Sequence, residues 1–87
     1  MLYKLVSVCR RLGNGEVVVY RCLELLPGRG FVVQSADRVR LPLRLEELQH
    51  HERQFWELLC EVAPEERTEP SPSLEQAIAA FDAEFGS

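Results

Sequence analysis

Hydrophobic and β-branched residues are dense in the first half of the chain and fall into three runs, at residues 2–11, 16–26 and 31–41. Runs of this length and composition predict strands. Asn14-Gly15 separates the first two runs, and this pair accepts the positive φ angles of a type I′ hairpin turn. The segment Pro27-Gly28-Arg29-Gly30 separates the second run from the third. We therefore expect a three-stranded antiparallel sheet in the order 1-2-3, although the first run also fits a helix.

The second half of the chain changes to the period of an amphipathic helix. Residues 45–63 form one apolar stripe before Pro64 ends the helix, and this stripe contains Leu45, Leu48, Phe55, Leu58, Leu59 and Val62. Residues 64–72 form an acidic, proline-rich connector that is too polar to pack. Ser73 and Gln76 form a capping box for a second helix at residues 74–85. The expected fold is a single α+β domain of 87 residues, a sheet followed by two C-terminal amphipathic helices.

Turn lengths decide which side chains share a face of the sheet, because a slip of one residue exchanges the faces. A three-residue loop at residues 28–30 sets Pro27 opposite Phe31. One face then consists of Val17, Val19, Leu23, Leu25, Phe31, Val33, Val39 and Leu41, together with Arg21 and Asp37 as an opposed ion pair. We expect Phe55 to be the most buried residue of helix 45–63 and to face Val19, Leu23 and Val33.

The other face of the expected sheet mixes apolar and charged residues. A two-residue loop at Asn14-Gly15 adds Tyr3 and Leu5 to it. An apolar surface rimmed by arginine and tyrosine is typical of a protein interface, and the candidate interface residues are Tyr3, Leu5, Tyr20, Val32, Arg38 and Arg40. The alternative is that helix 74–85 covers this face, since its connector is long enough to reach either side or a neighbouring chain.

Charge divides the chain into two halves. Residues 1–44 carry eight cations and three acids, for a net charge of +5, whereas residues 45–87 carry two cations and eleven acids, for −9. Such asymmetry can mark a partner surface. It also arises when basic strands and acidic helices neutralise each other within one domain. Arg10, Arg11, Arg38 and Arg40 offer a basic face for nucleic acid, but the acidic half would repel a polyanion.

Few residues combine into a recognisable chemical site. Ser35, Asp37 and His51 are the residue types of a hydrolase triad, but no nucleophile elbow surrounds the serine. His51 and Cys60 lie nine residues apart, which does not suit a zinc site. The segment 27–30 leads into a strand rather than a helix, so it is not a phosphate loop. We predict no catalytic residue, no cofactor and no metal.

The cysteines and the lengths of the apolar runs indicate the cellular compartment of the protein. Cys9, Cys22 and Cys60 are odd in number and lack a CxxC spacing, as expected for free, buried thiols in a reducing compartment. No apolar run is long enough for a membrane span, and no signal peptide is recognisable. The sequence therefore predicts a cytoplasmic protein that does not enter a membrane.

These observations favour a non-catalytic protein-interaction module, such as an adaptor, an inhibitor or immunity-type protein, or a small subunit. The simplest partner is a second copy of the chain, because two-fold homodimers are the commonest oligomers. Two alternatives remain open: a nucleic-acid-associated protein that uses the basic strand face, and a small enzyme of unknown type.

Overall fold

Three strands form an antiparallel sheet at the start of the chain, and helices follow it. The computed structural model describes residues 1–86. The strands are β1 (Leu2–Gly13), β2 (Glu16–Leu26) and β3 (Phe31–Arg40), in the order β1-β2-β3. The helices are α1 (Leu45–Glu61), α2 (Pro64–Arg67) and α3 (Leu74–Phe85). The predicted α+β architecture is confirmed, including a strand rather than a helix at the start of the chain.

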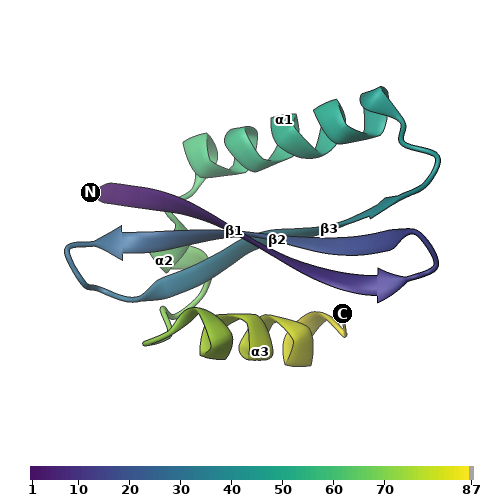
Figure 1. The fold of residues 1–87 in the computed structure, drawn as a ribbon. Coiled ribbons are helices and arrows are strands. Elements are labelled where there is room, and N and C mark those ends of the chain that lie inside the picture. Colours follow the sequence, from purple (N-terminus) through teal and green to yellow (C-terminus); the bar gives the residue numbers. More distant parts are fainter. Residues whose placement is uncertain (87) are drawn as a thin grey trace.

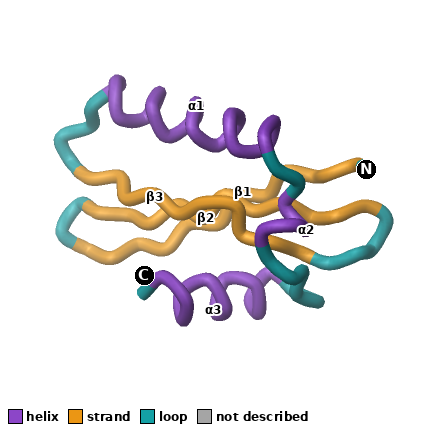
Figure 2. The backbone as a smooth tube through the Cα atoms, turned by 180° about the vertical axis from the view of Figure 1, so that it is seen from behind, coloured by secondary structure: helices purple, strands orange, loops and turns teal. Residues whose placement is uncertain are grey.

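The sheet lies between two helical layers. Figures 1 and 2 show α1 on one face of the sheet and α3 on the other, so α3 is the occupant of the second face. The buried residues accordingly form two clusters. The cluster beneath α3 contains Val18, Tyr20, Cys22, Val33, Ala77 and Ile78. The cluster beneath α1 contains Leu23, Leu25, Val32 and Phe55.

The β1–β2 hairpin has the expected turn but an unexpected register. Asn14 and Gly15 have φ angles of 54° and 71°, and Gly13 pairs with Glu16. A β-bulge at Leu12 then shifts the pairing by one residue, so that Arg11 pairs with Val17. A slip of one residue exchanges the two faces of a strand. The residues Tyr3, Leu5, Ser7, Cys9 and Arg11 consequently lie on the α1 face rather than beside Tyr20 as predicted.

The predicted β2–β3 register is also wrong. Leu25 and Gly30 close the loop with a backbone hydrogen bond of 2.8 Å, and Phe31 pairs with Glu24 rather than Pro27. The pairing shifts again at Gln34, where the ladder passes from Cys22↔Val33 to Arg21↔Ser35. As a result, Val33 packs beneath α3, and its neighbour Val32 packs beneath α1.

Glycine is required at the end of the β2–β3 loop. Gly30 has a φ of 104°, which side chains with a Cβ rarely adopt. A Cβ at this position would lie 2.9 Å from the Ser71 carbonyl oxygen. The connector therefore passes close to the backbone here, and the backbone of Ser71 forms two hydrogen bonds of 2.8 Å with Phe31.

The helices follow the sequence pattern with two corrections. Phe55 is the one buried residue of α1, as predicted, but it packs with Val32 rather than Val33. The connector, expected to be too polar to pack, contains α2, whose Pro64 is buried. Ser73 Oγ accepts a hydrogen bond from the Gln76 N–H at 3.1 Å and so caps α3 as expected. Within residues 1–86, no helix has both the length and the apolar character needed to cross a membrane.

Candidate functional site

The six predicted interface residues do not share one exposed face. Tyr20 is 1% exposed beneath α3, and Val32 is 2% exposed beneath α1. Neither side chain is exposed in this fold, because α3 covers Tyr20, as the alternative interpretation of the sequence allowed, and the bulge at Gln34 places Val32 on the opposite side. The remaining members are divided between the faces, with Tyr3 and Leu5 on the α1 side and Arg38 and Arg40 on the α3 side.

Tyr20 anchors α3 to the sheet through its hydroxyl. The Tyr20 OH donates to Asp82 of α3 at 3.0 Å, and the Arg10 guanidinium lies 3.3 Å from the same carboxylate. The Phe81 ring contacts the Tyr20 ring edge-on, with 6.4 Å between centroids. Burial and the adjacent Asp82 raise the pKa of Tyr20 above its usual value. These contacts make Tyr20 a structural residue.

Tyr3 has a similar role at the other end of the sheet. Its hydroxyl lies 2.8 Å and 2.9 Å from the two carboxylate oxygens of Glu65 in α2. Burial and this carboxylate raise the pKa of Tyr3. Leu5, two residues along β1, has no such cover and is 51% exposed. Of the six predicted residues, Leu5 is thus the exposed apolar one.

Most arginines of the strands are paired with acids inside the molecule. Arg38 and Arg40 lie 3.0 Å and 3.4 Å from Glu16, and Arg21 forms an ion pair with Glu52 of α1. Arg10 is paired with Asp82 of α3 in the same way. The pairs of Arg10 and Arg21 with acids of the helices favour the interpretation that basic strands and acidic helices neutralise each other, whereas Arg38 and Arg40 are paired within the sheet. All four pairs weaken the basic face needed for nucleic acid.

The outer edge of β1 has backbone groups with no partner strand among residues 1–86. Phe31 exchanges both of its backbone hydrogen bonds with Ser71, so its N–H and C=O point away from β2. The Leu41 N–H donates to the Gly15 carbonyl at 3.0 Å. At this end of β3, the backbone groups of odd-numbered residues therefore point toward β2. Alternation along the ladders then directs even-numbered residues of β2 toward β1. The backbone groups that point outward from β1 therefore belong to Tyr3, Leu5, Ser7, Cys9 and Arg11.

Apolar side chains accompany this edge. Leu2, Leu5 and Leu12 of β1 are 72%, 51% and 42% exposed. A groove between β1 and α1 is lined by Leu5, Ser7, Arg21, Glu52 and Phe55, among others. Edge strands are usually protected from pairing with other chains by a proline, by their short length or by a covering element. β1 has twelve residues and no proline, and its position at the end of the sheet leaves it paired with β2 alone among residues 1–86.

The outer edge of β3 is partly covered. Ser71 pairs with Phe31 at its start, and the Arg67 guanidinium donates to the Gln34 side-chain oxygen at 3.1 Å. Beyond the bulge, the alternation makes the backbone groups of Ala36, Arg38 and Arg40 point outward. The second half of β3 is therefore a second open edge.

A cavity of about 440 Å³ lies beside this edge, between β3 and α1. Its lining includes Ser35, Asp37, His51, Glu57 and Glu61. His51 Nε2 lies 3.8 Å from Asp37 Oδ1, and Arg21 Nε lies 3.5 Å from Asp37 Oδ2 without hydrogen-bond geometry. Ser35 Oγ, Asp37 Oδ2 and His51 Nδ1 are buried atoms that make no hydrogen bond within the described residues.

The structure thus brings together the three residue types of the triad that the sequence pattern did not support. A nucleophile needs a hydrogen bond to its base, and the described residues contain none between Ser35 and His51. The charged lining of the cavity consists of the carboxylates of Asp37, Glu57 and Glu61 together with His51. The sequence did contain one signal of this cavity, because Ser35 and Asp37 are two residues apart on one strand and therefore share a face. Their proximity to His51 depends on the strand register and could not be predicted from the sequence.

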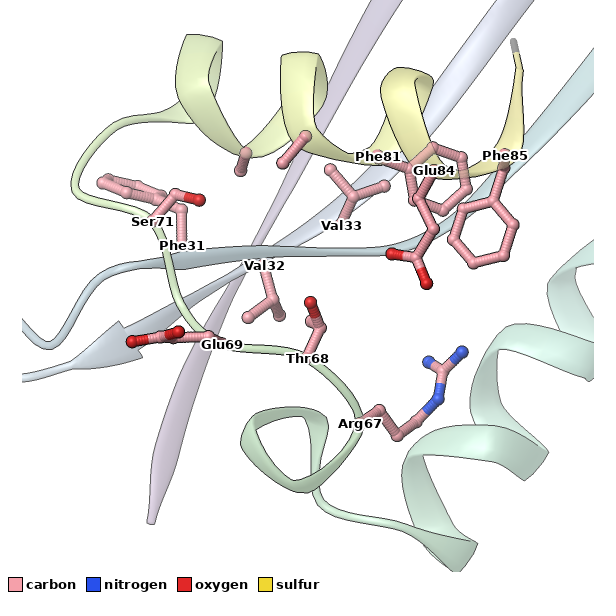
Figure 3. A pocket seen from close by; sticks show the side chains of 12 residues that line it. Phe31, Val32, Val33, Arg67, Thr68, Glu69, Ser71, Phe81, Glu84 and Phe85 are labelled. Carbon is pink, nitrogen blue, oxygen red and sulfur yellow. The ribbon is translucent and has the colours of Figure 1, made fainter.

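A smaller cavity of about 70 Å³ lies on the α3 side of β3. Figure 3 shows Phe81, Glu84 and Phe85 projecting from α3 on one side of β3, with Arg67 on the other. The two phenylalanine rings are 4.6 Å apart between centroids, and Phe85 is 62% exposed. Phe85 also lines a neighbouring cavity beside Ala36 and Arg38. The α3 side of the edge therefore presents the exposed aromatic ring of Phe85 beside charged side chains such as Glu84 and Arg38.

The cysteines differ from the expectation of buried thiols. Cys22 is buried beneath α3, and burial raises the pKa of its thiol to about 11, whereas Cys9 and Cys60 are exposed. Within residues 1–86, no group of three or more His, Cys, Asp or Glu side chains could hold a metal ion. Comparison with known proteins finds no matching family model, no similar curated protein and no similar solved structure.

Proposed function

We propose that this protein is a non-catalytic interaction module that forms a homodimer through the outer edge of β1. The observation that supports this function is the uncovered edge of β1, with five outward-facing backbone positions and the exposed side chains of Leu2 and Leu5. Strand-to-strand association satisfies such backbone groups directly. Two antiparallel β1 strands would join the sheets of two copies into one continuous sheet.

Charge selects a register for this pairing. A two-fold axis at Ser7 sets Lys4 opposite Arg10 of the second copy, and directly opposed like charges destabilise a sheet. An axis at Val6 instead sets Lys4 opposite Val8, and Leu5 opposite Ser7. Both registers pair residues whose backbone groups point outward, so the repulsion between Lys4 and Arg10 decides between them. We therefore place the axis at Val6.

A two-fold dimer of this kind would close on itself rather than grow into a fibre. An isologous contact uses the same patch on both copies, so the edge of β1 is consumed when two chains meet. The two α1 helices lie on the same face of the joined sheet, next to the grooves that contain Leu5. Trp56, which is 42% exposed and donates to Glu52 at 3.0 Å, lies on this side of α1.

The proposal predicts that Ser7→Pro converts a dimer into a monomer. The Ser7 N–H points away from β2, so proline removes no hydrogen bond within the chain but blocks the partner strand. Light scattering should give a dimeric mass for the wild type and a monomeric mass for S7P, with similar circular dichroism. Arg38→Pro is the matched control, since it places proline at an outward position of β3, and it should remain a dimer. A monomeric wild type would refute the proposal.

Cysteine cross-linking tests the register. In a background with C9S and C60S, chains carrying L5C should form a disulfide with chains carrying S7C, because opposed residues in such a pair lie about 5.5 Å apart between Cα atoms. S7C chains alone should not cross-link. Self-cross-linking of S7C would move the axis to Ser7.

A further inference from the structure

We propose that the open edge of β3 binds an extended peptide segment of another protein, whose side chains alternate between basic and apolar. This site is separate from the β1 edge and does not depend on the proposed dimer. The bound segment would lie antiparallel to β3, continuing the direction that the connector takes at Ser71.

The edge already pairs with one residue of the chain, in an isolated antiparallel bridge. The Ser71 N–H and C=O form two hydrogen bonds of 2.8 Å with Phe31, which is the pairing of one residue in an antiparallel ladder. Arg67 covers the bulge at Gln34. The outward backbone groups of Ala36, Arg38 and Arg40 remain without a strand partner among residues 1–86. Addition of a strand at such an edge supplies affinity through the main chain.

The α1 side of the edge selects basic side chains. Peptide residues opposite Ser35 and Asp37 would direct their side chains into the acidic cavity, which Glu57 and Glu61 also line. A guanidinium carries several donors in a planar arrangement that matches carboxylates. It would donate to Asp37 and to Ser35 Oγ, which makes no hydrogen bond within residues 1–86. The acidic balance of residues 45–87 favours a basic partner over an acidic one.

The α3 side selects apolar side chains. Peptide residues opposite Ala36 and Arg38 would direct their side chains toward α3, where Phe85 lines two adjoining cavities. Phe85 is 62% exposed although it extends the apolar stripe of α3. Successive residues of a strand point to opposite faces, so the two preferences alternate along the peptide with a period of two.

A second copy of the chain is a poorer occupant. Its β1 strand carries Lys4 and Arg10, but pairing β1 of one copy with β3 of another is a head-to-tail contact that does not close and would grow without limit. A peptide from another protein ends the sheet at this edge. The β3 edge and the β1 edge therefore suit different partners.

The test uses a fluorescent eight-residue peptide of alternating arginine and valine, with blocked ends, and measures anisotropy with the full chain. Binding should exceed that of a peptide with four arginines followed by four valines by about tenfold or more. Replacing both Glu57 and Glu61 by glutamine should weaken binding about tenfold. The control variant replaces Glu46 and Glu47 by glutamine. It changes the net charge by the same amount elsewhere on α1, and it should bind the peptide like the wild type. An equal loss in both variants would reduce the effect to net charge and overturn the proposed site.

Methylation of the peptide backbone tests the strand pairing without altering the protein. In the antiparallel arrangement, the N–H groups of the valines point toward β3 and those of the arginines point away. N-methylation of the valines should abolish binding, whereas N-methylation of the arginines should leave it unchanged. Equal affinity of the alternating and block peptides, or insensitivity to both methylation patterns, would overturn the proposal. The Ser7→Pro variant should bind the peptide normally, which separates failure here from failure of the dimer.

Discussion

Single side chains connect the layers of this small protein. Tyr20 crosses from the sheet to α3 and combines an apolar ring with a hydroxyl that reaches Asp82. Tyr3 connects β1 to α2 through Glu65 in the same manner. A buried tyrosine is stable only when its hydroxyl finds a partner. These two contacts explain why both tyrosines, predicted to belong to an interface, instead belong to the structure.

We predict that Tyr20→Phe lowers the free energy of unfolding by about 1.5–3 kcal/mol, the usual range for a hydrogen bond to a charged group. The pKa of Tyr20 is raised in the folded protein. The neutral phenol therefore contributes fully to stability at pH values below the pKa of tyrosine in the unfolded chain, about 10. This contribution is lost as the pH rises above 10 toward the folded pKa. Urea denaturation should therefore show a steeper alkaline loss of stability in the wild type than in Y20F. Equal slopes would contradict this assignment.

Elements differ in how firmly they are held to the sheet. α3 contributes Ala77 and Ile78 to the buried cluster and is capped at both ends, by Ser73 and by Gly86. α1 contributes Phe55 alone among its buried residues, and Leu45 in its first turn is 65% exposed. The attachment of α1 consequently depends on one aromatic side chain, while that of α3 is shared among several.

Phe55→Ala should destabilise the protein by about 3–5 kcal/mol, because it leaves a cavity between α1 and the cluster of Leu23, Leu25 and Val32. Trp56→Ala is a suitable control, since Trp56 is the adjacent aromatic residue and is 42% exposed. Thermal unfolding should show a much larger fall in Tm for F55A than for W56A. A Tm of F55A equal to that of the wild type would show that Phe55 does not hold α1.

The molecule as a whole presents two open strand edges of different character. The β1 edge carries apolar side chains and Lys4. The β3 edge lies between a cavity lined by three carboxylates and the exposed ring of Phe85. Helices cover both faces of the sheet, so the edges are the surfaces where its backbone remains available (Figures 1 and 2).

The two edges should act independently, because β2 separates them and no shared side chain connects their outward backbone groups. We predict that Arg38→Pro removes binding of the alternating peptide but keeps the dimeric mass, while Ser7→Pro has the opposite effect. Anisotropy and light scattering on the same two variants provide the measurement. Loss of both properties in either variant would indicate that the edges are coupled or that the fold has failed.

Local signals in the sequence determined the elements of this protein. Asn14-Gly15 specifies its turn because both positions need positive φ, and Ser73 with Gln76 begins α3 because a hydroxyl satisfies a free N–H. Phe55 could be identified as the anchor of α1 because helical periodicity places it at the centre of the apolar stripe. Each of these decisions involves residues close together in the chain.

Tertiary structure decided which residues share a face. One extra residue at Leu12 and another at Gln34 reverse the alternation of side chains, and neither bulge has a signature in the apolar pattern. The register moved Leu5 away from Tyr20, exchanged the faces on which Val32 and Val33 lie, and gathered Ser35, Asp37 and His51 around one cavity. The position of α3 over Tyr20 likewise rests on the distant residue Asp82. Pairing between strands and packing between layers depend on the sum of long-range contacts, which local periodicity does not contain.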